Sequence, residues 1–231
     1  MKTIGLLGGM SWRSTVDYYA IINDYVNKKL GKFHSAKILM FSVDFEEIEQ
    51  FQQRGRWDEA TDVIIDAAKR VERAGADFVL ICTNTMHKMA DEVRANITIP
   101  LLHIADATAK EIKKKGFKKV GLLGTRFTME QDFYRDVLVR HKLEVLIPDQ
   151  EDRETIHKII YGELISGKIE TLSRQKCRKI INKLADRGCG GIILGCTEFP
   201  LLIKQKDSDV HLFDTTKIHA IAAAELALSE E

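Results

Sequence analysis

Two short polar clusters in this sequence have residue types suited to proton transfer. Gly195-Cys196-Thr197-Glu198 follows an apolar run at residues 191–194, and Thr83-Asn84-Thr85 follows a similar run at residues 78–81. Aligning the glycine-ended segments that precede them sets Thr83 opposite Cys196, so the clusters resemble copies within a repeat. Two polar loops around a small ligand would allow acid and base chemistry on both faces of one carbon atom.

Cys196 is the strongest single candidate for this chemistry. It follows Gly195, which lets a ligand or backbone approach closely, and it precedes a short helix expected to start at Thr197-Glu198. A helix N-terminus lowers the pKa of a thiol, so we expect a thiolate able to accept a proton. The alternative is a small buried hydrophobe, which we expect for Cys177 and Cys189.

The cluster Thr83-Asn84-Thr85 offers hydroxyl, amide and backbone N–H donors that could hold a carboxylate. The alternative is a helix cap, because Asn and Thr cap well. The same two interpretations apply to Thr125, whereas Thr128 opens a capping-box pattern and is expected to start a helix. Because side chains alternate along a strand, Cys82 is expected to face the packed layer.

Apolar runs rich in β-branched residues alternate with amphipathic stretches, which is typical of parallel sheets covered by helices. Loops that follow such strands lie at the edge where α/β proteins bind ligands, so the polar clusters are expected to face one cleft. The clearest helix spans residues 58–73 and stops before Gly75. Strands are expected at residues 3–7, 36–43, 78–82, 99–103, 119–123, 143–146, 191–194 and 210–213.

The apolar segments at residues 4–8 and 120–124 match at nearly the same interval as the polar clusters. The sequence therefore predicts two pseudo-symmetric parallel-sheet α/β domains with the active site in the cleft between them. The first domain would comprise residues 1–104, completed by a C-terminal helix at 214–231. The second would comprise residues 105–213.

Composition excludes several classes of protein. The chain has 231 residues, 45% of them apolar, with 35 basic and 34 acidic groups, so neither disorder nor a nucleic-acid partner is expected. No stretch approaches the roughly 20 apolar residues of a membrane span, and no signal segment opens the chain, which favours a cytoplasmic protein. Metal-ligand spacings and dinucleotide or P-loop motifs are missing, so no metal or cofactor is expected.

Three segments resemble the aspartate/glutamate racemase family, and the likeness covers essentially the whole chain. They are residues 1–10, the run Thr83-Asn84-Thr85-Met86-His87, and Gly195-Cys196-Thr197-Glu198. The resemblance implies a cofactor-independent enzyme in which two cysteines serve opposite faces of the α-carbon. Cys196 matches one of them, whereas the other position holds Thr83. This implies an asymmetric Thr83/Cys196 acid–base pair.

Within the family, this Thr, a Val43-Asp44-Phe45 segment, Gln52 and Gly55 resemble racemases specific for L-aspartate and L-glutamate. Cys196 would then remove the α-proton of the L-enantiomer. Donors must meet the developing negative charge, and other residues must line the substrate. The candidates for binding an acidic amino acid are Met10, Gln52, Asn84, Thr85, Thr125 and Thr197.

The cation that binds the substrate side chain stays open. A lysine found in some family members corresponds to Ile165 here, and Lys168, Arg54 and Arg56 are the alternatives. Two other functions also stay open: a single-thiol decarboxylase or isomerase of the same superfamily, and a non-catalytic dicarboxylate or amino-acid sensor. A homodimer formed through the helices of one domain is a further expectation.

Overall fold

The computed structural model describes residues 1–229. The chain forms two compact units. The first unit comprises Met1–Ile104 and the segment that begins at His219, and the second comprises Ala105–Ile218. Each unit is built on its own parallel sheet, so the predicted α/β fold class is confirmed.

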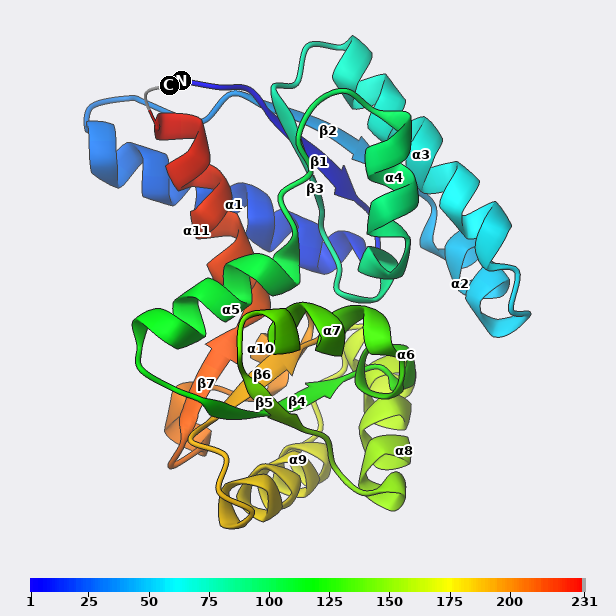
Figure 1. The fold of residues 1–231 in the computed structure, drawn as a ribbon, viewed down its shortest axis with the longest axis vertical. Coiled ribbons are helices and arrows are strands. Elements are labelled where there is room, and N and C mark those ends of the chain that lie inside the picture. Colours follow the sequence, from blue (N-terminus) through cyan, green and yellow to red (C-terminus); the bar gives the residue numbers. More distant parts are fainter. Residues whose placement is uncertain (230–231) are drawn as a thin grey trace. The chain divides into compact units, whose positions relative to one another are not determined.

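The sheet of the first unit has three parallel strands in the order β2-β1-β3 (Figure 1). The central strand is completely buried, as expected for a continuous apolar run covered on both faces. The strands are β1 (Ile4–Gly8), β2 (Ile38–Ser42) and β3 (Phe78–Ile81).

The strand predicted at residues 99–103 is reduced to a single parallel bridge between Leu101 and Val79. Val79 N–H donates to the Pro100 carbonyl, and Leu102 N–H donates to the Val79 carbonyl, both at 2.9 Å. Pro100 has no N–H of its own, and a helix starts at Ile104, so the ladder cannot extend in either direction. This short segment still aligns the chain with β3 where it leaves the first unit.

Helices cover both faces of this sheet (Figure 1). One face packs against α1 and α11, and the other packs against α2, α3 and α4, so the core has an apolar cluster on each side. The helical elements are α1 (Trp12–Leu30), α2 (Phe45–Gln53), α3 (Trp57–Arg73), η1 (Thr85–Met89), α4 (Ala90–Asn96) and α11 (Thr215–Leu228).

Helix α3 follows directly from its sequence. Asp58 and Glu59 lie in its first turn and Arg70 and Arg73 in its last, which complements the helix dipole. Gly75 follows with φ of 98°, a conformation in which glycine is favoured. A stripe of small and branched residues at helical spacing is buried: Ala60, Ile64, Ala67, Ala68 and Val71.

The sheet of the second unit has four parallel strands in the order β5-β4-β6-β7. Helices α8, α9 and α10 contribute to an apolar cluster with β4 and β6. The strands are β4 (Lys119–Gly124), β5 (Glu144–Leu146), β6 (Gly191–Gly195) and β7 (His211–Asp214). The helical elements are α5 (Ile104–Lys114), α6 (Arg126–Glu130), α7 (Asp132–Arg140), α8 (Gln150–Ile159), η2 (Ile160–Leu164), α9 (Thr171–Asp186), α10 (Phe199–Leu202) and η3 (Gln205–Asp207).

The predicted helix start at Thr128 is wrong. Thr128 lies inside α6, and the cap is Thr125, whose hydroxyl accepts a hydrogen bond from Thr128 N–H at 3.3 Å. The chain turns into a helix as soon as β4 ends, so the earlier of the two threonines takes the capping position. Among residues 1–229, no helix combines the length and apolar character needed to span a bilayer.

Candidate functional site

In the first unit, Cys82 and Thr83 have different surroundings although they are adjacent. Cys82 N–H donates to the Leu7 carbonyl at 2.9 Å, and its side chain is fully buried in a cluster that contains Tyr18 and Leu80. Burial raises the pKa of the Cys82 thiol, because the charged thiolate would lose its hydration. The expectation that Cys82 faces the packed layer is confirmed.

Thr83 is half-buried and begins the turn that leads into η1. Its carbonyl oxygen lies 2.8 Å from Nδ1 of His87, and the His87 N–H donates to the Asn84 carbonyl at 3.1 Å. Asn84 already has helical backbone angles, with φ of −75° and ψ of −46°, and its side chain does not cap η1. The capping interpretation therefore does not apply to Asn84, which is buried together with Thr85.

The other candidates of the first unit lie close to this turn. Gln52 is buried in α2 and its Nε2 donates to Sδ of Met86, at 3.0 Å, in the same η1 turn as Thr85. Met10 is buried and follows β1, which pairs with β3. The β1 and β3 loops therefore lie at the same edge of the sheet, which brings the predicted residues of this unit together.

In the second unit, the strand register brings Thr125 and Cys196 to one edge. Gly124 of β4 pairs with Gly195 of β6, and the two candidates follow these partners directly. A Cβ atom added at Gly195 would lie 2.7 Å from the Leu123 carbonyl oxygen, so glycine allows the close approach of the two strand ends.

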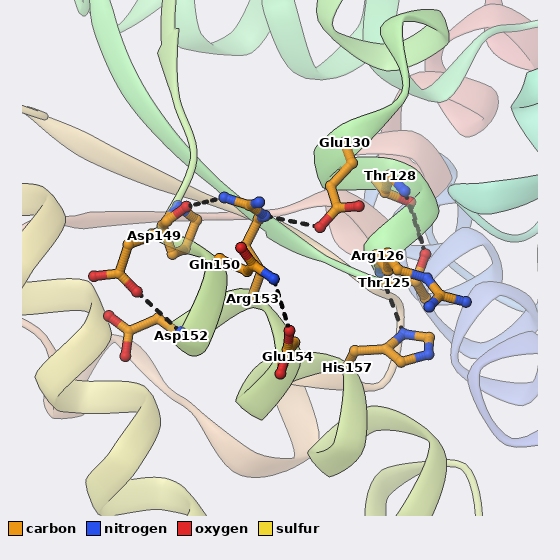
Figure 2. A network of polar contacts seen from close by, with 11 residues as sticks. Thr125, Arg126, Thr128, Glu130, Asp149, Gln150, Asp152, Arg153, Glu154 and His157 are labelled. Atoms are coloured by element: carbon orange, nitrogen blue, oxygen red, sulfur yellow. Dashed lines mark hydrogen bonds and ion pairs between the residues drawn. The ribbon is translucent and has the colours of Figure 1, made fainter.

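Helix α8 supports the start of α6, where Thr125 lies (Figure 2). Arg126 N–H donates to Nδ1 of His157 at 3.3 Å, and Arg153 Nε donates to Glu130 Oε1 at 2.8 Å. Burial, together with the Arg126 charge, lowers the pKa of His157, which keeps the ring available as an acceptor. Thr125 is thus fixed by contacts at both ends of α6.

Cys196 is hydrogen-bonded to the carboxylate of Glu198. The Cys196 thiol donates to Glu198 Oε2 at 3.2 Å, and the Thr197 hydroxyl donates to the same oxygen at 3.0 Å. All three residues are buried. A thiol at this distance from a carboxylate can transfer its proton directly to it. Glu198 was not among the site residues predicted from the sequence.

The expected low pKa of Cys196 is wrong. Burial raises the pKa of the thiol well above its usual value, and the Glu198 carboxylate raises it further. The backbone N–H groups of Glu198 and Phe199 act in the opposite direction but are the smaller influence. Helix α10 has only four residues, so its dipole is weak, and burial prevails. The resting thiol is protonated.

The cations considered from the sequence differ in their surroundings. Arg56 lies 2.6 Å from Glu59 in an exposed ion pair, and Arg54 and Lys168 are exposed. Lys88, which the sequence analysis missed, is half-buried in η1 with Nζ 3.9 Å from the centroid of the Trp57 ring. Burial lowers the pKa of Lys88. Its place directly after the Thr83-Asn84-Thr85-Met86-His87 run was the available signal.

Metal sites and cavities away from the predicted residues would also be candidates for ligand binding. Among residues 1–229, no group of three or more His, Cys, Asp and Glu side chains is arranged to hold a metal ion. A cavity of about 300 Å³ lies between α8 and α9. Its charged groups include Lys183, which pairs with Asp152 at 2.7 Å, and no predicted site residue lines it.

Comparison with known proteins identifies the family to which the chain belongs. The family model described as Asp/Glu/Hydantoin racemase matches residues 7–223. A crystal structure of a candidate Asp/Glu racemase from Yersinia pestis is 53% identical, with a TM-score of 0.92, and the match covers 99% of this chain and 100% of that one.

Two further relatives extend the comparison. The crystal structure of PH1733, an aspartate racemase homologue from Pyrococcus horikoshii OT3, is 38% identical with a TM-score of 0.85 over 99% of this chain and 100% of that one. The broad specificity amino-acid racemase RacX of Bacillus subtilis is 26% identical over 92% of both chains. The chain therefore belongs to the Asp/Glu/hydantoin racemase family and is an isomerase.

Proposed function

We propose that the protein is a cofactor-independent racemase of L-aspartate, L-glutamate or both. The observation that carries the proposal is the buried hydrogen bond from the Cys196 thiol to Glu198 at the carboxyl end of β6. The substrate class is supported by the descriptions of the Yersinia pestis and Pyrococcus horikoshii proteins, which concern aspartate and glutamate.

The first half of the reaction uses Cys196 and Glu198. The thiol proton passes to the Glu198 carboxylate, and the resulting thiolate sulfur accepts the α-proton of the L-enantiomer. The electron pair of the broken C–H bond stays on the substrate as a carbanion conjugated with its carboxylate. Because Glu198 lies within hydrogen-bond distance of the thiol, the transfer needs no solvent molecule.

The carbanion must be stabilised by donors that are already in place. The first unit offers Asn84 and Thr85, and the second offers Thr125 and Thr197, all of them buried. Burial excludes water and strengthens each hydrogen bond to the developing charge. Met10 and Gln52 line the substrate in this proposal, and Lys88 joins Arg54 as a candidate for its side-chain carboxylate.

The second half of the reaction uses Thr83, whose hydroxyl relays a proton from solvent to the opposite face of the α-carbon. Glu198 returns the thiol proton to solvent, which restores both groups. A threonine hydroxyl is a far poorer base than a thiolate, so the reverse reaction from the D-enantiomer is slow. This asymmetry concerns rates and leaves the equilibrium between the enantiomers unchanged.

Proton NMR of L-aspartate and L-glutamate in D₂O tests the proposal. Loss of the α-proton signal, with D-enantiomer on a chiral column, is expected for the wild-type protein and for Cys82→Ala, which removes a core thiol. Cys196→Ala should abolish α-proton exchange. Thr83→Val, which removes the hydroxyl, should retain exchange and lose racemisation. Absence of exchange with both amino acids would refute the proposal.

A further inference from the structure

Three buried histidines cluster in the first unit, and the proposed reaction uses none of them. The ring centroids of His87 and His103 are 4.5 Å apart, and those of His87 and His219 are 5.8 Å apart. The three residues are far apart in sequence: His87 lies in η1, His103 precedes α5, and His219 lies in α11. Buried imidazoles need hydrogen-bond partners, and these partners define what the cluster does.

The hydrogen bonds of His87 fix its tautomer. Ile104 N–H donates to Nε2 of His87 at 3.1 Å, so this nitrogen carries no proton. Nδ1 must therefore hold the proton of the neutral ring, and it donates to the Thr83 carbonyl at 2.8 Å. A protonated ring would direct the Nε2 proton at the Ile104 N–H, so the geometry accepts only the neutral form.

The environment also keeps His87 neutral. Burial lowers the pKa of His87 well below its usual value, and His103, His219 and Arg94 lower it further. The bond to the Thr83 carbonyl acts in the opposite direction but does not prevail. The imidazole consequently keeps one donor and one acceptor throughout the neutral pH range.

His219 forms a hydrogen bond to the same backbone segment, at Leu102. Its Nε2 lies 2.9 Å from the Leu102 carbonyl and its Nδ1 lies 2.9 Å from the Tyr18 hydroxyl. A carbonyl can only accept, so Nε2 is the donor and Nδ1 accepts from Tyr18. Leu102 and Ile104, the last residues before the chain enters the second unit, are thus each held by a histidine side chain.

We propose that His87 is a positioning residue that links the Thr83 carbonyl to the Ile104 N–H and so sets the placement of Thr83 in the racemase reaction. The inference rests on the proposed function. Rotation of the peptide group after Thr83 would break the bond to Nδ1, and movement of Ile104 would break the bond to Nε2. The rigid His87 ring therefore fixes the turn that contains Thr83 relative to Ile104, where the chain leaves the first unit.

Three substitutions separate the two hydrogen bonds. The amide nitrogen of His87→Asn can replace Nδ1 and donate to the Thr83 carbonyl. The amide oxygen of His87→Gln can replace Nε2 and accept from Ile104. His87→Leu removes both bonds while it preserves apolar volume. Each variant is assayed for α-proton exchange of L-aspartate in D₂O and for formation of D-aspartate.

The ratio of racemisation to exchange is the decisive readout. In the proposed reaction, exchange needs Cys196 and Glu198 but not Thr83, whereas racemisation also needs Thr83. His87→Leu and His87→Gln should lower racemisation by about 10- to 100-fold, the scale of a misplaced catalytic group, and keep exchange near the wild-type rate. His87→Asn should restore racemisation. An equal fall of exchange and racemisation in all three variants would overturn the proposal.

Nitrogen-15 NMR of the histidine rings gives a readout that does not depend on turnover. The chemical shifts of His87 should identify a neutral ring protonated at Nδ1 at pH 6 and at pH 8. A ring protonated at Nε2, or one that becomes a cation by pH 6, would overturn the assignment. If the wild-type protein shows no α-exchange, the proposed function fails, and these shifts alone decide whether His87 holds the Thr83 carbonyl.

Discussion

The Cys196 thiol and the Thr197 hydroxyl donate to one oxygen of Glu198, at 3.2 Å and 3.0 Å. Burial and the charge of the Glu198 carboxylate both raise the pKa of Cys196. The thiol is therefore protonated in the resting protein, and we propose that it passes its proton to Glu198 during the reaction.

Glu198→Gln separates these two effects. The neutral amide removes the carboxylate charge, so the pKa of Cys196 should fall and alkylation by iodoacetamide should become fast at a lower pH than in the wild-type protein. The α-proton exchange rate should nevertheless fall by roughly 100-fold, because glutamine cannot take the thiol proton. Mass spectrometry of the Cys196 peptide gives the pH profile. An unchanged or higher alkylation midpoint would contradict the assignment.

Cys82→Ala tests whether the adjacent thiol takes part in the chemistry. The side chain is fully buried among apolar residues, so its removal leaves a small cavity and should lower the free energy of unfolding by about 1–2 kcal/mol. The α-proton exchange rate should stay at the wild-type value. Urea denaturation and the NMR assay measure the two quantities. Loss of exchange in a folded Cys82→Ala variant would move the chemistry to Cys82.

The strands and the loop positions were predictable because both depend on local pattern. Apolar runs end one or two residues before Thr83 and Cys196, and parallel pairing brings such ends to one edge of each sheet. The exception is the run around Leu101, which forms only an isolated bridge. The apolar pattern of such a run does not show how many of its residues pair with the neighbouring strand.

The electrostatics of the site was not predictable from local pattern. Helix position indicated a low pKa for Cys196, whereas burial and Glu198 raise it. The histidine cluster was also missed, because His87, His103 and His219 come from distant segments with no metal-like spacing. Their proximity is a consequence of packing, and no short motif records it.

Gly195→Ala tests how strictly the strand end must be glycine. The new Cβ would lie 2.7 Å from the Leu123 carbonyl and 2.9 Å from Cδ1 of Leu122, so β6 must shift beside Cys196. Overpacking of this kind should lower the free energy of unfolding by about 1–3 kcal/mol. It should also lower the α-proton exchange rate, because the shift displaces Cys196.

Gly162→Ala is the matched control for this substitution. A Cβ at Gly162 meets nothing within 4 Å, so stability should stay within about 1 kcal/mol of the wild-type value. Thermal unfolding and the exchange assay are run on both variants. Equal behaviour of Gly195→Ala and Gly162→Ala would show that the close approach at Gly195 is unimportant.

Burial lowers the pKa of His219 from 6.5 to about 3, so this histidine makes stability depend on pH. Between pH 6.5 and 3 the unfolded chain binds a proton at this position and the folded chain does not. Stability therefore falls as the pH falls through this window, with a slope of up to about 1.4 kcal/mol per pH unit from one group. The contribution is fully present above pH 6.5.

His219→Gln removes this titration, and its amide nitrogen can still donate to the Leu102 carbonyl in place of Nε2. Urea denaturation between pH 6 and 4 is followed by the fluorescence of Trp12 and Trp57, which both lie in the first unit with His219. At pH 6 the variant should be less stable than the wild-type protein. As the pH falls to 4, its free energy of unfolding should decrease by about 1 kcal/mol less per pH unit than that of the wild-type protein. Because Tyr18, His87 and His103 are unchanged, the difference in slope belongs to His219. Parallel curves for the two proteins would mean that His219 titrates alike in the folded and unfolded chains and is not held neutral by its burial.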